Sequence, residues 1–138
     1  MRTGNLFTLS LLLFLIPLTS QAFLWESMEK VEKEFGQAVK VEEGNKIDGV
    51  KYSVKKSEFK YKDYRIFAYS NNKGSCVRLS IVGPQMDKKI SETEMKKFLK
   101  LVEKGKWSKT ETDFLSPSKK WQCVYGFGFM TIVKYYPT

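Results

Sequence analysis

The sequence predicts an α+β domain in which two helices pack on an antiparallel sheet. Apolar residues recur with helical spacing in residues 24–38, and apolar and polar residues alternate with a period of two in residues 49–82. A strong helix-start signal precedes an apolar helical face in residues 91–102. The expected order is therefore an N-terminal helix, a three-strand antiparallel meander, a second helix and a C-terminal strand or hairpin, clamped by one disulfide.

Residues 1–22 have the pattern of a secretory signal peptide. An arginine precedes an uncharged apolar run over residues 6–18, which is shorter than the roughly 20 apolar residues of a membrane span. Ser20 and Ala22 place small side chains at the positions that signal peptidase requires, so we expect cleavage after Ala22. An uncleaved N-terminal anchor is the alternative. Residues 23–138 would then form a single secreted or periplasmic domain.

The first predicted helix follows the cleavage site. Its apolar residues are four, three, four and three positions apart and so share one helical face: Leu24, Met28, Val31, Phe35 and Ala38. This stripe is too short for a coiled coil, so the helix is expected to pack on the domain's own sheet. It should fray near Gly36 and end before the turn residues 43–45.

Three antiparallel strands are predicted after this turn. In residues 49–70, two runs of alternating apolar and polar residues are separated by a polar reversal at residues 60–63. A second reversal at residues 71–74 leads into residues 76–82, which should form a hairpin with the preceding strand. All three runs are typical of strands with one face exposed to water.

The second helix has a complete set of start signals. Ser91 and Glu94 match a capping box, and Ile90 and Met95 occupy the positions of a hydrophobic staple. Gly105 is the expected stop, because glycine accepts the left-handed backbone that commonly ends a helix.

The C-terminal part is predicted to begin with a loop over residues 106–120, which is followed by the aromatic stretch 121–137. That stretch is either one strand or a hairpin that turns at residues 126–128, where glycine permits a positive φ. Strands usually have five to eight residues, which favours the hairpin.

Cysteine and histidine usage limits the chemistry. Cys76 and Cys123 are the only cysteines, and in an exported protein an even pair predicts one disulfide. Two buried free thiols are the alternative. Histidine is absent, which removes the commonest general base and the usual ligands of zinc, copper and iron. We therefore expect neither a metal nor a cofactor.

The charge is concentrated in the body of the domain. Residues 49–138 hold 19 basic and eight acidic residues, a net charge of +11. The chain has 21 lysines but only three arginines, which makes nucleic acid an unlikely partner because phosphate and base recognition depends on arginine. An anionic polymer or lipid surface remains a candidate partner. The candidate anion-binding residues are Lys55, Lys56, Lys60, Lys62, Lys96, Lys97, Lys100 and Lys104; separate, solvated lysines are the alternative.

Surplus aromatic residues point to a binding surface. Tyrosine is favoured at protein interfaces because it joins a large apolar body to a polar tip. The candidates are Tyr61, Phe67, Tyr69, Tyr135 and Tyr136, with half-buried core positions as the alternative. Glu111 and Asp113 are close enough in sequence to raise a carboxylate-based hydrolase as a minor possibility.

No catalytic residues are assigned. The sequence predicts a secreted or periplasmic, non-enzymatic domain that binds another protein in the envelope or outside the cell, as an inhibitor or chaperone does. The alternative is an electrostatic binder of anionic envelope polymer or of a lipid surface.

Overall fold

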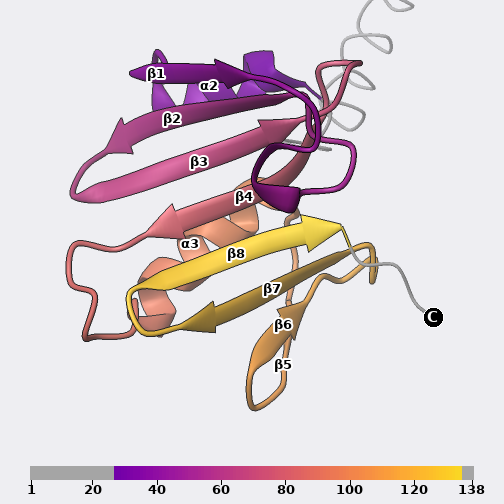
Figure 1. Ribbon diagram of the computed structural model, residues 1–138. Helices are drawn as coiled ribbons and strands as arrows, with labels where there is room; N and C mark the ends of the chain where they lie inside the picture. The colour runs from indigo at the N-terminus through magenta and orange to yellow at the C-terminus, as the bar shows by residue number, and fades with distance from the viewer. Residues whose placement is uncertain (1–26, 135–138) are drawn as a thin grey trace, which may run out of the picture.

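The computed structural model describes residues 27–134, which fold into one antiparallel sheet with two helices on one of its faces (Figure 1). The eight strands are β1 (Lys40–Glu43), β2 (Lys55–Tyr61), β3 (Tyr64–Ser70), β4 (Cys76–Val82), β5 (Ser108–Lys109), β6 (Asp113–Leu115), β7 (Trp121–Gly126) and β8 (Phe129–Lys134). They lie in the order β1-β2-β3-β4-β8-β7-β6-β5. The helices are α2 (Met28–Phe35) and α3 (Glu92–Val102), and a 3-10 turn, η2, spans Ile47–Gly49.

The core lies between the helices and the sheet. Every second strand residue points toward the helices, as the pleat requires. The buried strand residues include Phe59, Ile66, Leu79, Ile81, Met130 and Ile132. They pack against the apolar stripes of the helices, formed by Met28, Val31, Phe35, Met95, Phe98, Leu99 and Val102. We call this side of the sheet the covered face and the opposite side the open face.

Local signals explain where each helix begins and ends. Ser91 accepts a hydrogen bond from the backbone N–H of Glu94 (3.2 Å), so the predicted cap of α3 is confirmed. Ser27 caps α2 in the same way. α2 ends at Phe35 because Gly36 takes a positive φ of 90°, and the chain then enters β1. The helix thus ends next to Gly36, where its fraying is predicted, and Ala38 of the predicted stripe lies beyond it.

The predicted sheet is wrong. β2, β3 and β4 are consecutive neighbours, but they are part of an eight-stranded sheet and not a separate three-strand meander. The alternation in residues 50–54 belongs to a loop, while residues 106–120 contain β5 and β6. Residues 121–134 form a hairpin, with Gly128 at the turn at a φ of +79°. Its strand β8 pairs with β4 and so joins the two halves of the sheet.

The predicted disulfide between Cys76 and Cys123 is wrong as well, and both thiols are buried and free. Cys76 lies in β4 and Cys123 in β7, with β8 running between them. Neighbouring strands are about 4.8 Å apart, so the two Cα atoms are separated by at least about 9.5 Å, whereas a disulfide needs less than about 7 Å. Burial raises the pKa of Cys76 and of Cys123 to about 12.

The predicted signal peptide, Tyr135 and Tyr136 lie outside the described residues. Within residues 27–134, α2 and α3 have 8 and 11 residues, and no helix there has the length and apolar character of a membrane span.

Candidate functional site

The open face presents three rows of side chains that cross the sheet from strand to strand. The strand registers define them. The first row is Glu42, Lys56, Tyr69, Arg78, Val133, Gln122 and Leu115; the second is Lys40, Glu58, Phe67, Ser80, Thr131, Val124 and Asp113; the third is Lys60, Arg65, Val82, Phe129 and Gly126. The rows divide this face into a charged and aromatic half over β1–β4 and a largely uncharged half over β4, β8 and β7.

Cations and rings alternate on the charged half. The Lys56 ammonium lies 5.0 Å from the ring centre of Phe67 and 5.6 Å from that of Tyr69. Arg65 stacks on Phe67 at 5.1 Å and Arg78 on Tyr69 at 5.7 Å. Such contacts stabilise by about 0.5–1 kcal/mol each at exposed sites. They leave Phe67 half-buried, whereas Tyr69 is also covered by the 44–54 loop and is buried.

Asp48 fastens the loop of residues 44–54 onto this half. Its Oδ2 accepts hydrogen bonds from Lys56 Nζ (2.6 Å) and from the hydroxyl of Tyr69 (2.8 Å). These bonds, that of Lys56 first, hold the pKa of Asp48 below its usual range. The same contact raises the pKa of Lys56, and burial, followed by the bond to Asp48, raises the pKa of Tyr69. Ile47 and Val50 complete the attachment by packing against Tyr69.

The 44–54 loop has an unusual backbone. Lys46, Asp48 and Tyr52 have positive φ angles of 51°, 52° and 68°, a region that bulky side chains rarely occupy. Ser53 is fully buried and its hydroxyl donates to the carbonyl of Val50 (2.7 Å), which holds the turn. The strained backbone turns Tyr52 outward, so that 63% of it is exposed. Strain of this kind persists only where surrounding contacts enforce it, and it is common at functional sites.

The uncharged half is a strip of short side chains with apolar residues at one end. Ser80, Thr131 and Val133 form its floor. Four exposed apolar residues lie toward the turn of the β7–β8 hairpin, and we call them the hairpin-tip cluster. Phe127 and Phe129 are at the turn, Met86 lies beside Gly128, and Val124 is in β7 opposite Thr131. A Cβ atom at Gly126 would lie only 2.7 Å from the ring of Phe129, so glycine at this position lets that ring lie over β7. Phe127 is 64% exposed, pairs with Lys89 in an isolated bridge and has the Lys89 ammonium 5.6 Å from its ring centre.

The opposite end of the strip reaches the 44–54 loop. Residues 49–52 and the strand residues Val77, Arg78 and Val133 line a small hollow of about 210 Å³ there. The uncharged strip is therefore bounded by Tyr52 and its loop at one end and by the hairpin-tip cluster at the other. Together they form the candidate functional site.

The predicted aromatic surface is only partly assembled. Phe67 and Tyr69 lie on the open face, although Tyr69 is buried beneath the 44–54 loop. Tyr61 lies on the covered face, where its ring contacts Phe35 at 5.2 Å and Phe98 at 6.2 Å. The sequence reasoning did not single out Tyr52 or the hairpin-tip cluster. In the sequence, Tyr52 alternates with its neighbours as a strand residue does, although it lies in a loop. The strand register is what places Val124 and Phe129 on the open face.

The predicted lysine residues fall into two separate groups. Lys56 and Lys60 lie on the open face, Lys55 begins β2, and Lys62 is in the turn after β2 with its ammonium over the ring of Tyr61 (5.4 Å). Lys96, Lys97 and Lys100 belong to α3, on the other side of the sheet, and Lys104 follows that helix (Figure 1). The sheet separates Lys56 and Lys60 from the lysines of α3, so the predicted lysines do not form one continuous patch. Lys55 and Lys62 lie on the side of the covered face.

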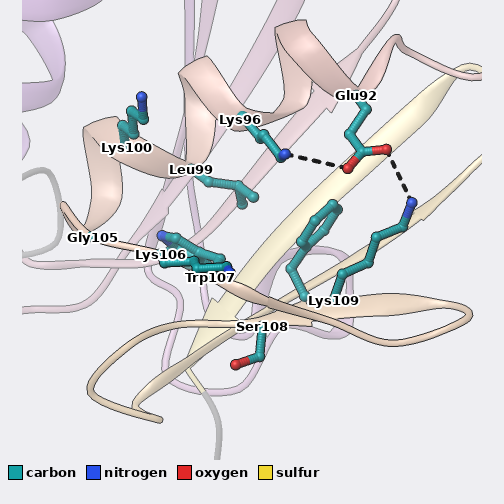
Figure 2. A pocket seen from close by; sticks show the side chains of 10 residues that line it. Glu92, Lys96, Leu99, Lys100, Gly105, Lys106, Trp107, Ser108 and Lys109 are labelled. Carbon is teal, nitrogen blue, oxygen red and sulfur yellow. Dashed lines mark hydrogen bonds and ion pairs between the residues drawn. The ribbon is translucent and has the colours of Figure 1, made fainter.

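A second hollow lies on the helix side, between α3 and the β5–β6 hairpin (Figure 2). Its volume is about 470 Å³, and Leu99, Trp107 and Phe114 form its apolar lining. At its rim, Glu92 lies between two lysines: Lys109 Nζ is 3.0 Å and Lys96 Nζ 3.4 Å from its carboxylate oxygens. We call this hollow the α3 pocket.

The two acids considered for hydrolysis are not arranged as a catalytic pair. Asp113 accepts hydrogen bonds from the hydroxyl of Thr110 and from Gln122 Nε2 (2.6 Å), and so serves as a structural link between β6 and β7. Glu111 lies exposed in the β5–β6 turn. Among residues 27–134, no three His, Cys, Asp or Glu side chains gather closely enough to hold a metal ion.

Comparison of the chain with protein-family models, with curated proteins and with solved structures finds no match. A functional assignment therefore depends on the geometry of these surfaces.

Proposed function

We propose that the protein is a non-enzymatic, protein-binding domain that works in the periplasm or outside the cell, and that its partner binds across the uncharged strip of the open face. The observation that carries this proposal is the position of the exposed apolar residues. Tyr52, which is 63% exposed, bounds the strip at one end, and Phe129, which is 40% exposed, lies on the open face at the other. Clustered exposed apolar residues with a polar surround are typical of protein–protein contacts.

The floor between these ends fits a polypeptide partner. Ser80, Thr131 and Val133 are short, so a partner backbone can approach the sheet closely. The hydroxyls of Ser80 and Thr131 share a hydrogen bond (3.4 Å), and Ser80 also accepts one from Arg78 Nε (3.3 Å). A hydroxyl can take part in up to three such bonds, so each retains capacity for a partner's peptide group. Aromatic residues at the rim would supply most of the binding energy, as is usual for interface hot spots.

The free thiols are compatible with export. Cys76 and Cys123 are both buried and too far apart to pair within one chain. Thiol oxidation proceeds through the thiolate, and burial raises the pKa of each thiol to about 12. Both cysteines would therefore stay reduced in an oxidising compartment for as long as the protein remains folded.

The electrostatic alternative is less well supported. Three of the lysines proposed for anion binding have an acid beside them, Lys56 with Asp48, Lys96 with Glu92 and Lys97 with Glu94, so the positive charge there is partly neutralised. Of the remaining ones, Lys60 lies on the open face, whereas Lys55, Lys62 and the lysines at α3 lie on the covered side. A broad cationic face that could track a polymer or a lipid surface is therefore not assembled.

A matched pair of valine substitutions tests the proposal. Val124 on the open face and Val41 in β1 are both strand residues, with exposures of 41% and 48%. We would immobilise the wild-type protein, Val124→Lys and Val41→Lys, incubate each with envelope and secreted extract, and wash at low and high salt. Discrete proteins retained at high salt would be identified by mass spectrometry.

The expected result is a partner that wild type and Val41→Lys retain at high salt and that Val124→Lys holds at least about tenfold more weakly, since a buried charge in a desolvated interface is costly. A partner retained equally by all three proteins would overturn the placement on the open face. Elution of all bound material as salt rises would favour the electrostatic alternative.

A further inference from the structure

The α3 pocket has the size and lining of a small-molecule site. Its volume of about 470 Å³ is within the range of roughly 300–1,000 Å³ that is usual for ligand pockets. Leu99 and Phe114 are almost fully buried and form a rigid base beneath the pocket, and Trp107, which is 8% exposed, is the lining aromatic that a ligand reaches. The indole of Trp107 is fixed by a hydrogen bond from its Nε1 to the carbonyl oxygen of Glu103 (2.9 Å).

The rim of this pocket is cationic. Lys96, Lys100, Lys106 and Lys109 line it together with one acid, Glu92. Lys96 reaches Glu92 from the helix and Lys109 from the strand, whereas Lys100 extends away from this group (Figure 2). Within residues 27–134, neither Lys100 nor Lys106 forms an ion pair with an acid. The pocket therefore keeps an excess of positive charge beside an apolar lining.

Glu92 shows how a carboxylate fits between the two lysines. Its oxygens lie 3.0 Å from Lys109 Nζ and 3.4 Å from Lys96 Nζ, and these contacts, that of Lys109 first, hold the pKa of Glu92 below its usual range. All three side chains are about half exposed, at 45–59%. Exposed ion pairs stabilise weakly, so an external anion can displace the Glu92 carboxylate at little cost.

We propose that the α3 pocket binds a small amphipathic anion, whose apolar body lies over Trp107 and along the aliphatic stems of the lining lysines and whose carboxylate-type head replaces Glu92 between Lys96 and Lys109. The rim charge selects an anion over a neutral molecule. The volume admits one compact body, about the size of a fused aromatic ring pair or a short acyl chain. This site is on the opposite side of the sheet from the proposed protein interface and does not depend on it.

Titration with 2-naphthoate and its neutral analogue 2-naphthamide tests the proposal. Affinities would be measured by calorimetry, and the site would be mapped by backbone amide shifts. We expect naphthoate to bind at least about fivefold more tightly than naphthamide and to shift amides of α3 and β5. Lys109→Gln should weaken naphthoate binding about fivefold, while Glu92→Gln should tighten it, because the internal competitor is gone.

Lys97→Gln is the matched control. Lys97 is next to Lys96 in α3, but it pairs with Glu94 at 3.1 Å and does not line the pocket, so its loss should leave naphthoate binding unchanged. Equal binding of naphthoate and naphthamide would overturn the proposal. So would weaker binding by Glu92→Gln, or shifts confined to the open face. Phosphatidylglycerol vesicles that bind through Lys96 and Lys109, without any naphthoate binding, would point to a membrane surface and would also overturn it.

Discussion

The covered and open faces of the sheet use the same strands, but their side chains are held in different ways. On the covered face, Phe59 and Ile66 are fully buried because two helices lie over them. On the open face, Phe67 is half-buried between Lys56 and Arg65, whose long side chains stack on its ring. A strand sends alternate residues to opposite sides, so aromatic residues reach both faces. The aromatic residues under the helices form the core, whereas Phe67 on the open face is held in place by cation–π contacts.

The largest difference between the faces concerns thiol chemistry. Cys76 and Cys123 lie in the core, and modification requires that the fold opens, so we expect native protein to react with a thiol reagent at least about a thousandfold more slowly than unfolded protein. In denaturant, both thiols should react. Thr131→Cys, which moves a thiol to the open face beside the buried Ile132, should react at once. Rapid labelling of the native wild type would show that the core is not closed.

Truncating one phenylalanine on each face should give the next largest contrast. Phe59→Ala leaves a cavity under α2 and should lower the free energy of unfolding by about 3–5 kcal/mol. Phe67→Ala loses contacts with exposed cations and should cost only about 1–2 kcal/mol. Urea unfolding monitored by circular dichroism measures both. Equal losses would mean that the open face is as tightly packed as the core.

Acid should release the 44–54 loop before it affects the core. The pKa of Asp48 lies below its ordinary value of 3.8, so the stabilisation from its bonds to Lys56 and Tyr69 is present above that pH and is lost as the pH falls through the lowered pKa. Amide signals of residues 46–52 should therefore change below about pH 3.8, and those of β4 and β8 should not. In Asp48→Asn the loop signals should lack this transition. A loop transition above pH 5 would contradict the assignment to Asp48.

The smallest expected effect is on the stability of the valine variants. Val124→Lys and Val41→Lys replace exposed side chains and should each change the free energy of unfolding by no more than about 0.5 kcal/mol. Thermal unfolding of both proteins checks this. A large loss for Val124→Lys alone would indicate that this part of the open face is covered within the molecule.

Sequence reasoning succeeded where the signal was local. α3 begins after Ser91 because the cap is encoded in four residues, and β4 matches the predicted residues 76–82 because its apolar alternation is uninterrupted. It failed where local patterns have two interpretations. Val50, Tyr52 and Val54 alternate like a strand, but the positive φ angles of Asp48 and Tyr52 make the segment a turn.

Long-range arrangement was not accessible in the same way. An even number of cysteines does not say how far apart they lie in the fold, so it could not reveal that β8 separates Cys76 from Cys123. β5 and β6 have only two and three residues, too few to show a period. Phe67 was recognised as an aromatic candidate, whereas Tyr52 and Phe129 were missed, because their exposure depends on loop strain and on strand register.

The outermost strands of the sheet bear on self-association. β1 has the sequence KVEE, in which three of four residues are charged, and β5 consists of only Ser108 and Lys109. A short edge strand offers few free hydrogen-bonding groups, and a charged one disfavours pairing with a strand of another molecule. The protein should therefore remain monodisperse at concentrations at which a sheet with long apolar margins would grow into fibrils.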